Sequence, residues 1–277
     1  MGEATRATAG RLTPEQESAW ERDGFFIVRG FAEPELLREM DEHVVDLVRR
    51  NAAGEAIAPA FVTIEEKVAD VARNPEDALS KLFRIHREQP VFREFIARAD
   101  LLSLCAGILG DDLDCFLSQY IAKRPGALGQ PWHQDAFYFP FDRGPQVGIW
   151  LAITEAREDN GPLWVLPGSH RDPVHETVPD PRPHANYGYV EIVDRETEDA
   201  IPVLMQPGDI LLFHSHLMHK STDNMSEGSR MAMVYHVANS ATVDLAPEKW
   251  GFTPPNVDWM PVLRSGERVP VDPSARS

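Results

Sequence analysis

The most informative stretch of the chain is Pro131-Trp132-His133-Gln134-Asp135-Ala136-Phe137-Tyr138-Phe139. Along a β-strand, residues two apart point to the same face, so His133 and Asp135 would present an imidazole and a carboxylate side by side. A mixed imidazole and carboxylate set with open positions is the ligand pattern of non-haem Fe(II) oxygenases. The same tripeptide also occurs by accident, and a surface salt link at the end of a strand is the simpler interpretation. The rest of the chain has to decide between these two interpretations.

The composition is that of an ordinary globular protein and disfavours polyanionic partners. The chain has 277 residues, of which 43% are hydrophobic and 26% charged, and its net charge is −17 from 44 acidic and 27 basic residues. Binding of nucleic acid or of an anionic membrane needs clustered lysine and arginine, so we expect neither partner. No apolar run approaches the ~20 residues that a membrane span needs.

The cysteines and the first residues of the chain indicate a cytoplasmic protein. Cys105 and Cys115 provide neither a disulfide framework nor a CxxC metal knuckle, and a reducing compartment suits them. Residues 1–12 lack a basic start followed by an apolar core, so we expect no secretory signal. We predict a flexible tail over residues 1–12 and a single domain over residues 13–277.

The N-terminal part of the chain predicts mainly helices. Thr13-Pro14-Glu15-Gln16 has the pattern of a capping box at a helix start. Pro34 opens a longer helix whose apolar stripe is suited to packing on a sheet. The other elements expected in this part are a helix end near Asp23-Gly24, a strand over 25–28, loops with one short helix over 51–80, and helices around 90–98 and 100–109, the second capped by Asp100.

After Gly110 the sequence changes to short strands separated by turns. Asn160-Gly161 and Pro207-Gly208 are strong signals for tight turns. Several short strands with regular turns predict a sandwich or barrel, here preceded by helices. The expected strands are 115–122, 146–154, 163–166, 209–213 and 231–237.

A second group of histidines follows one of these strands. His214, His216 and His219 lie close together in the sequence, and such a tract can form a simple metal cluster. His214 and His216 are also two residues apart, so they are an alternative to His133 and Asp135 as ligands of a different metal.

Arg230 lies at the start of the strand expected over 231–237, after a predicted hairpin loop over 223–228. A hairpin brings its strands ~5 Å apart, so we expect His219 and Arg230 to share a pocket. A guanidinium inside a barrel needs an anion, and a carboxylate fits its planar fork. The alternative for Arg230 is a structural ion pair with one of the many aspartate or glutamate residues.

A series of residues in fixed order runs through the β-rich part of the chain. It consists of His133-Gln134-Asp135, Trp150, Asn160-Gly161-Pro162-Leu163, Leu166-Pro167-Gly168-Ser169-His170, Gly208-Asp209, His219-Lys220-Ser221, Asn224 and Arg230. In order, spacing and identity this series resembles the phytanoyl-CoA dioxygenase family, over roughly residues 24–237. The resemblance implies a mainly β fold with flanking helices and a double-stranded β-helix, or jelly-roll, core. It also implies a dioxygenase that uses Fe(II), 2-oxoglutarate and dioxygen to hydroxylate a small organic metabolite, releasing succinate and carbon dioxide.

The resemblance assigns roles to the residues of the candidate site. His133, Asp135 and His219 correspond to the three iron ligands of the family. Arg230 corresponds to the residue that pairs with the distal carboxylate of 2-oxoglutarate, with Ser221 beside it.

Three further residues are assigned to the cosubstrate site by the same resemblance. Trp150 stands where the family has a tryptophan that lines this site, and Lys81 where an upstream lysine contacts 2-oxoglutarate. Gln119 falls where relatives often have a methionine near the cosubstrate, so a polar group there departs from the family pattern. Asp135 favours hydroxylation or another oxygenase reaction, because a small residue replaces this carboxylate in related halogenating enzymes.

Two segments are candidate parts of a substrate pocket. Residues 137–139 are aromatic and either wall the pocket or pack in the core. The long stretch 171–206 is a candidate lid, since long loops in compact domains are often functional.

Three alternatives stay open beside the metabolite hydroxylase. A jelly-roll sensing protein would bind the metal and 2-oxoglutarate without turnover. A zinc-type hydrolase with the same ligands leaves Arg230 and Ser221 without a purpose. An acyl-CoA 2-hydroxylase would have to bind an anionic CoA thioester, which an acidic surface disfavours unless Arg84, Arg87 or Lys123 cluster near the mouth. We therefore expect a small molecule such as a secondary metabolite.

Overall fold

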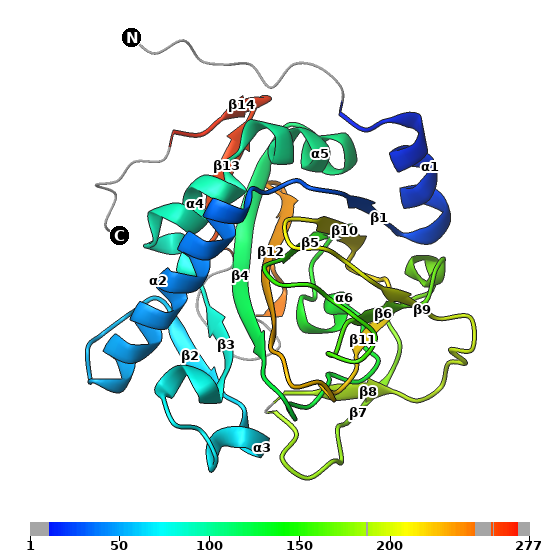
Figure 1. The fold of residues 1–277 in the computed structure, drawn as a ribbon. Coiled ribbons are helices and arrows are strands. Elements are labelled where there is room, and N and C mark those ends of the chain that lie inside the picture. Colours follow the sequence, from blue (N-terminus) through cyan, green and yellow to red (C-terminus); the bar gives the residue numbers. More distant parts are fainter. Residues whose placement is uncertain (1–10, 187, 247–255, 257, 271–277) are drawn as a thin grey trace.

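In the computed structural model, which describes residues 11–186, 188–246, 256 and 258–270, a nine-stranded antiparallel sheet lies at the centre of the protein (Figure 1). Its strands are β1 (Phe25–Val28), β2 (Phe61–Ile64), β3 (Leu79–Phe83), β4 (Leu113–Lys123), β5 (Val147–Ala152), β10 (Ile210–His214), β12 (Arg230–Asn239), β13 (Met260–Arg264) and β14 (Glu267–Arg268). A smaller sheet consists of β6 (Leu163–Val165), β9 (Ile201–Val203) and β11 (His219–Ser221). A separate hairpin is formed by β7 (Thr177–Pro179) and β8 (Val190–Ile192).

The strand order explains how distant segments meet at one place. Neighbours in the large sheet follow the order β1-β10-β5-β12-β4, and the small sheet has the order β11-β6-β9. Beyond β4 the large sheet divides, because β13 pairs with the first residues of β4 and β3 pairs with residues 119–121. Two sheets of antiparallel strands around an interior pocket form the jelly roll that the sequence predicts. The expected strands occur as β4, β5, β6, β10 and β12, with ends that differ by one or two residues.

Alternation along β12 separates the core from the interior pocket. Met233 and Tyr235 face the helices and belong to the main hydrophobic cluster. Arg230, Val234 and His236 face the other way and line the pocket. Every second residue of a strand points to the same face, so this single strand contributes to both environments.

The described residues form the helices α1 (Pro14–Asp23), α2 (Pro34–Ala52), α3 (Glu66–Ala69), α4 (Pro90–Ile96), α5 (Ala99–Leu109) and α6 (Asp135–Tyr138), with 3-10 turns η1 (Pro75–Ala78), η2 (Ile85–Arg87) and η3 (Ser169–Arg171). Helices α2, α4 and α5 pack in the main hydrophobic cluster on the face of the large sheet to which Met233 and Tyr235 point, and Figure 1 shows them apart from α6. Helix α6 instead lies at the pocket, which its Asp135 and Tyr138 line. The predicted capping box is present, because Thr13 Oγ1 accepts from the Gln16 backbone N–H and Gln16 Oε1 accepts from that of Thr13. Helix α2 buries Met40 and Val44 in the main cluster, as its stripe predicts. No helix of the described residues is long and apolar enough to cross a membrane.

Two expectations for the N-terminal part were wrong. The stretch 51–80 contains the expected short helix, α3, but it also contains β2 and the start of β3, which extend the large sheet beyond β4. These strands are short and are stabilised by pairing with a distant strand, so the local pattern did not identify them. Asp100 does not cap α5, because the N-cap is Arg98 and Asp100 lies within the first turn, where it forms an ion pair with Arg98 at 2.6 Å.

The segments predicted as a tail and a lid are only partly described. Residues 1–10 of the predicted tail lie outside the described residues. Arg11 forms an ion pair with Asp111 at 2.9 Å, and Leu12 packs against the main cluster. The stretch 171–206 holds the three short strands β7, β8 and β9, each paired with another strand, among turns and irregular segments.

Candidate active site

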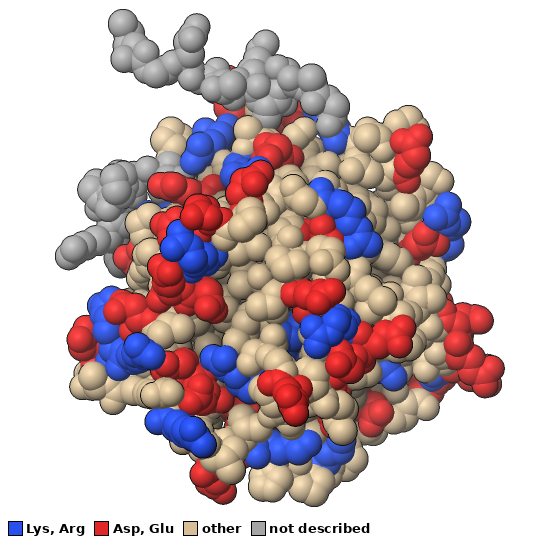
Figure 2. All heavy atoms as spheres, viewed as in Figure 1, with Lys and Arg blue, Asp and Glu red and all other residues tan. Residues whose placement is uncertain are grey.

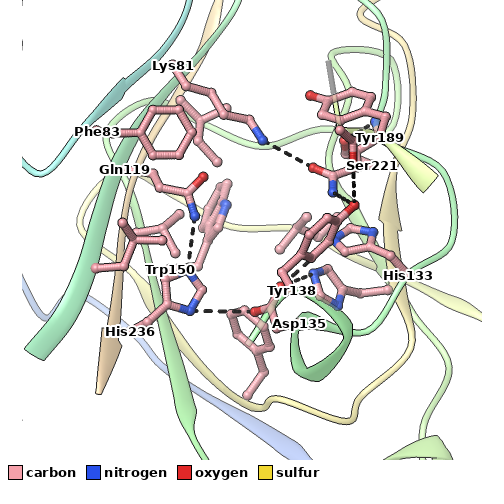
Figure 3. Close-up of a pocket in the computed structure, with 18 of the residues that line it drawn as sticks. Lys81, Phe83, Gln119, His133, Asp135, Tyr138, Trp150, Tyr189, Ser221 and His236 are labelled. Atoms are coloured by element: carbon pink, nitrogen blue, oxygen red, sulfur yellow. Dashed lines mark hydrogen bonds and ion pairs between the residues drawn. The ribbon is translucent and has the colours of Figure 1, made fainter. Parts of the chain in front are cut away.

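The three predicted metal ligands converge inside the pocket, and two of them, His133 and Asp135, are labelled in Figure 3. His133, Asp135 and His219 are buried, and each offers one ligand atom within 4.8 Å of the other two. Asp135 Oδ1 lies 3.9 Å from His133 Nε2 and 3.7 Å from His219 Nε2. No other group of histidine, cysteine and acidic residues in the described chain has such a geometry, so His214 and His216 do not form the alternative site.

The position of Asp135 beside His133 does not come from a strand, so that expectation was wrong. His133 forms an isolated bridge with His219 through two backbone hydrogen bonds of 2.9 and 3.0 Å, and Asp135 begins α6. Between them, the buried Gln134 donates from its side chain to the carbonyl oxygens of Pro173 and His216. A short turn fixed by a buried amide therefore brings the two side chains together.

Hydrogen bonds to the backbone fix the orientation of both imidazoles. His133 Nδ1 lies 2.7 Å from the carbonyl oxygen of Pro131, and His219 Nδ1 lies 2.9 Å from that of Leu217. A carbonyl oxygen only accepts, so each Nδ1 carries the proton and each Nε2 presents a lone pair toward Asp135. Burial, aided by the neighbouring His219, holds the pKa of His133 well below its usual range. Two neutral imidazoles and one carboxylate fit a divalent metal ion such as Fe(II).

Arg230 is a buried cation in the same cavity. Its Nε and Nη2 donate to the carbonyl oxygen of Gly161 at 3.1 and 2.8 Å, and Nη1 has no hydrogen-bond partner. Within the described residues no carboxylate pairs with it, so the alternative of a structural ion pair was wrong. Burial lowers the pKa of Arg230 to about 10, and the guanidinium stays charged near neutral pH. A buried cation with a free donor is suited to an anionic ligand.

His219 and Arg230 share this cavity, although the predicted hairpin between them is wrong. β11 pairs with β6 in the small sheet, whereas β12 pairs with β4 and β5 in the large sheet. His219 therefore reaches the pocket from the small sheet and Arg230 from the large sheet, and the two side chains line the same cavity.

Further polar groups surround Arg230. Lys123 Nζ donates to Ser221 Oγ at 2.8 Å and to the carbonyl oxygen of Thr222 at 2.6 Å. The Trp150 ring lies 5.5 Å from the guanidinium carbon, and its buried Nε1 donor has no partner. Burial and the nearby Arg230 lower the pKa of Lys123 well below its usual range. Lys123 was considered only as a basic residue near the mouth of the pocket, although its spacing of four from Gln119 puts both on one face of β4.

The two remaining predicted residues also line the cavity. Lys81 Nζ donates to Gln130 Oε1 at 3.3 Å and lies 4.9 Å from the centre of the Tyr189 ring (Figure 3). Gln119 Nε2 lies 3.1 Å from Nε2 of His236, a buried residue that the sequence analysis did not select. One cavity of about 370 Å³ thus contains all eight predicted residues: Lys81, Gln119, His133, Asp135, Trp150, His219, Ser221 and Arg230. Their individual roles stay predictions.

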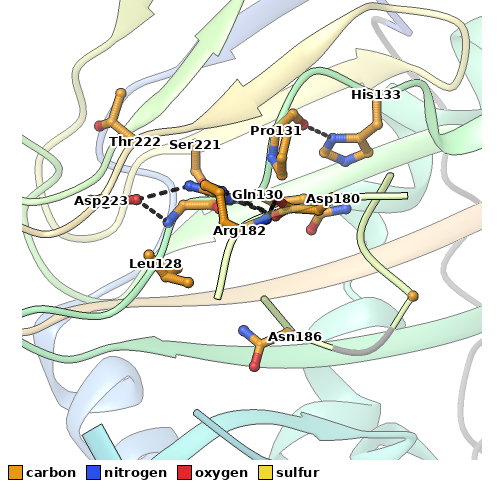
Figure 4. A network of polar contacts seen from close by, with 12 residues as sticks. Leu128, Gln130, Pro131, His133, Asp180, Arg182, Asn186, Ser221, Thr222 and Asp223 are labelled. Carbon is orange, nitrogen blue, oxygen red and sulfur yellow. Dashed lines mark hydrogen bonds and ion pairs between the residues drawn. The ribbon is translucent and has the colours of Figure 1, made fainter. Parts of the chain in front are cut away.

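Part of the stretch 171–206 is tied to the cavity by a polar network (Figure 4). Arg182 forms ion pairs with Asp180 at 2.7 Å and with Asp223 at 3.4 Å. Asn186 donates to the buried Glu65 at 2.8 Å. Gly188 and Tyr189, which follow in the same stretch, line the cavity. The segment expected to act as a lid therefore forms part of the cavity wall.

Comparison with known proteins identifies relatives of this fold. The family model described as Phytanoyl-CoA dioxygenase (PhyH) matches residues 20–232. The chain is 26% identical over 271 residues to Phytanoyl-CoA dioxygenase 1 of Oryza sativa subsp. japonica, covering 87% of this chain and 94% of that protein. Among solved structures it is similar to EctD from S. alaskensis with 2-oxoglutarate and 5-hydroxyectoine, at 21% identity and a TM-score of 0.63, covering 83% and 77% of the two chains. It is also similar to the epimerase SnoN in complex with Fe3+, alpha ketoglutarate and nogalamycin RO, at 16% identity and a TM-score of 0.63, covering 91% and 96%.

Proposed function

The chain belongs to the phytanoyl-CoA dioxygenase family, and from this premise we propose that it is an Fe(II)- and 2-oxoglutarate-dependent dioxygenase that hydroxylates a small organic metabolite. One observation carries the proposal. The cluster of His133, Asp135 and His219 shares a cavity with the unpaired Nη1 donor of Arg230. A metal site and an anion site in one enclosed space suit a metal-chelating dicarboxylate.

In this proposal His133, Asp135 and His219 hold Fe(II). Three protein ligands leave coordination positions open for a chelating cosubstrate and for dioxygen. When bound, the metal and 2-oxoglutarate supply the oxidising chemistry, with release of succinate and carbon dioxide. The protein provides ligands whose protonation is already set, because each Nδ1 is bound to a backbone carbonyl.

Arg230 in turn binds the distal carboxylate of 2-oxoglutarate through Nη1. A charge-assisted hydrogen bond would satisfy the one donor of this guanidinium that has no partner. Ser221 and Lys123 are joined at 2.8 Å and place a hydroxyl and an amino group in the same part of the cavity. Trp150 lines the same space, and Lys81 contributes a further cation to the cavity.

The cavity supports a small metabolite as substrate rather than an acyl-CoA thioester. Its volume of about 370 Å³ lies in the range of small-molecule sites. Arg84 forms an ion pair with Asp258 at 3.1 Å, Arg87 donates to the carbonyl oxygen of Asp258, and Lys123 is buried. Arg84 and Arg87 are thus both engaged by Asp258, and Lys123 lines the cavity without them, which does not favour a basic cluster for a CoA moiety. On the face shown in Figure 2, basic side chains lie among acidic ones.

The test is substrate-stimulated succinate formation with Fe(II), 2-oxoglutarate and dioxygen over a panel of small metabolites. His133→Ala and Asp135→Ala should abolish both Fe(II) binding and turnover. His216→Ala is the matched control, because it removes an imidazole outside the ligand cluster and should leave Fe(II) binding intact. Undiminished turnover in His133→Ala would refute the assignment. Binding of Fe(II) and 2-oxoglutarate without any oxygen consumption would favour the sensing protein instead.

We also propose that residues 13–277 act as one catalytic domain in a reducing, cytoplasmic setting. One hydrophobic cluster extends from Phe26 to Leu263, which supports a single core. Cys105 and Cys115 are both free thiols and buried, as a reducing compartment allows. Limited proteolysis that released a stable smaller fragment would contradict the single domain.

A further inference from the structure

The ligand cluster leaves one carboxylate oxygen without a partner. Asp135 Oδ1 faces both imidazole Nε2 atoms, whereas Oδ2 is buried and accepts no hydrogen bond. A buried acceptor without a donor costs free energy, and a carboxylate costs more than a neutral group. His236 faces this oxygen, with Nδ1 at 3.6 Å from Oδ2 (Figure 3). His236, on β12 of the large sheet, is thus the polar group that faces Asp135 Oδ2.

The position of His236 is fixed by its surroundings. It lies on β12 and is 3% exposed. The rings of Phe116 and Phe139 pack against it, with centroids 5.7 and 5.2 Å away. Its Nε2 lies 3.1 Å from Nε2 of Gln119. The imidazole is therefore held between aromatic walls with one nitrogen toward Asp135 and the other toward Gln119.

These contacts favour one tautomer of His236. A carboxylate only accepts, so the tautomer that suits the approach of Nδ1 to Asp135 Oδ2 at 3.6 Å carries the proton on Nδ1. Nε2 of His236 is then an acceptor, and the amide nitrogen of Gln119 is its donor. The Gln119 oxygen consequently points away from His236. In this arrangement it faces the cavity, which Gln119 lines.

We propose that His236 is a positioning residue that donates to Asp135 and, through its other nitrogen, orients the Gln119 oxygen as an acceptor for the substrate. The inference rests on the proposed function and narrows its substrate class. The substrate carries a hydroxyl or N–H donor close to the carbon that is hydroxylated. Gln119 lies opposite Phe83 on β3 and Val234 on β12, so this acceptor is set among apolar neighbours. An acceptor held among apolar neighbours discriminates strongly, because a substrate without a donor leaves it unpaired.

The first arm of the test measures metal binding and does not need the substrate. Fe(II) is titrated anaerobically in the presence of 2-oxoglutarate, with the dissociation constant read by calorimetry. His236→Leu removes the donor and should weaken Fe(II) binding by about 10- to 100-fold. His236→Asn keeps an amide donor near the position of Nδ1 and should restore most of the affinity. Tyr235→Phe is the control, because its hydroxyl bonds to Phe92 on the opposite face of β12.

The outcomes of this arm separate the inference from the proposed function. If the wild type binds no Fe(II), the proposed function fails and the inference fails with it. If the wild type binds Fe(II) and His236→Leu binds it equally well, only the inference is overturned. Should His236→Leu not fold, the Fe(II) affinity of His236→Asn is compared with that of the wild type and of Tyr235→Phe. If His236→Asn bound Fe(II) as weakly as a variant that lacks one of the proposed ligands, the positioning role would be overturned.

The second arm measures the choice of substrate. Pairs of small hydroxy acids and amines are compared with their O-methyl and N,N,N-trimethyl counterparts, which have no O–H or N–H donor at that position, with succinate as the readout. The wild type should prefer the donor-bearing member by at least about tenfold in kcat/KM. Gln119→Met should remove this preference and leave Fe(II) affinity within about twofold. A wild type without preference, or a preference that persists in Gln119→Met, overturns the assignment of Gln119.

Discussion

Arg230 donates from both Nε and Nη2 to the carbonyl oxygen of Gly161, which leaves Nη1 as a buried donor without a partner. Replacement of Arg230 by Met should therefore weaken binding of 2-oxoglutarate by at least about 100-fold, since a charge-assisted bond in a buried site is lost. Fe(II) affinity should change little, because Arg230 contacts none of the proposed ligands. Calorimetric titration of each ligand separates the two effects.

Arg29→Met is the matched control for this prediction. Arg29 forms an ion pair with Asp209 at 2.6 Å, but its side chain is 60% exposed. Its loss should leave the affinity for 2-oxoglutarate unchanged. Equal affinities of the wild type and Arg230→Met would show that the cosubstrate carboxylate is held elsewhere.

Gln134 stabilises the turn that carries two of the proposed metal ligands. Its side chain donates to the carbonyl oxygens of Pro173 and His216 and accepts from the backbone N–H of His175. Replacement by Leu leaves these buried groups unpaired, so we expect the free energy of unfolding to fall by about 3 kcal/mol or more. Fe(II) binding should weaken as well, because the turn is no longer fixed. Chemical denaturation and Fe(II) titration measure the two effects.

A second buried glutamine provides the control for Gln134→Leu. Gln146 is 4% exposed, and its Oε1 has no hydrogen-bond partner. Gln146→Leu therefore removes fewer favourable contacts and should destabilise the protein less. If both variants lost the same stability, the hydrogen bonds of Gln134 would not account for its effect.

His86 predicts a specific dependence of stability on pH. Burial, together with nearby arginines, lowers the pKa of His86 to about 3, and Nδ1 lies 2.7 Å from Ser118 Oγ. The unfolded chain takes up this proton near pH 6.5, whereas the folded protein does not, so stability falls as the pH drops below about 6.5. The slope is about 1.4 kcal/mol per pH unit for this one group. His86→Gln should remove this contribution to the pH dependence. Between pH 7 and pH 5 the free energy of unfolding should therefore fall by about 2 kcal/mol less in the variant than in the wild type.

Denaturant unfolding curves at several pH values test the prediction for His86. His43→Gln on α2 changes a histidine at the surface and should keep the slope of the wild type. Parallel curves for the wild type and His86→Gln would mean that His86 does not contribute to the acid sensitivity.

Arg182 connects the stretch that covers the cavity to the segments beneath it. It pairs with Asp180 and Asp223 and donates to the carbonyl oxygen of Gly129 at 2.5 Å. Arg182→Ala should loosen the segment around Gly188, raise the KM of the substrate several-fold and leave Fe(II) affinity unchanged. Steady-state kinetics and hydrogen exchange of this segment measure the change. Arg195→Ala, which removes a surface ion pair with Asp172 in the same stretch, should behave like the wild type.

The strand candidates and the ligand cluster could be predicted from the sequence because their signals are local or strictly ordered. The capping box at Thr13 depends on residues three apart, and the strands of the large sheet have apolar runs bounded by turns. His133, Asp135 and His219 stand in a series whose order carries the resemblance. A resemblance of this kind assigns the ligand positions of the family to residues of this chain, even where the secondary structure expected around them is wrong. The prediction of the cluster was therefore confirmed although Asp135 begins a helix rather than continuing a strand.

Features that depend on pairing between distant strands could not be predicted. The spacing of Gln119 and Lys123 places both on one face of β4, but only the pairing of β4 with β12 shows that this face meets His236. The prediction of a hairpin between His219 and Arg230 was wrong for the same reason. Which sheet a short strand joins depends on strands that are distant in the sequence. Gln134 was missed because its partners are backbone groups from two other segments.

The alternation along β12 also has an evolutionary consequence. Positions that face the helices, such as Met233 and Tyr235, determine whether the protein folds. Positions that face the cavity, such as Val234, determine which molecules it accepts. Because the two sets point to opposite faces of one strand, a substitution at a cavity-facing position leaves the side-chain contacts of Met233 and Tyr235 in the main cluster in place. New substrates can therefore be selected for along this strand without rebuilding the packing of the helices.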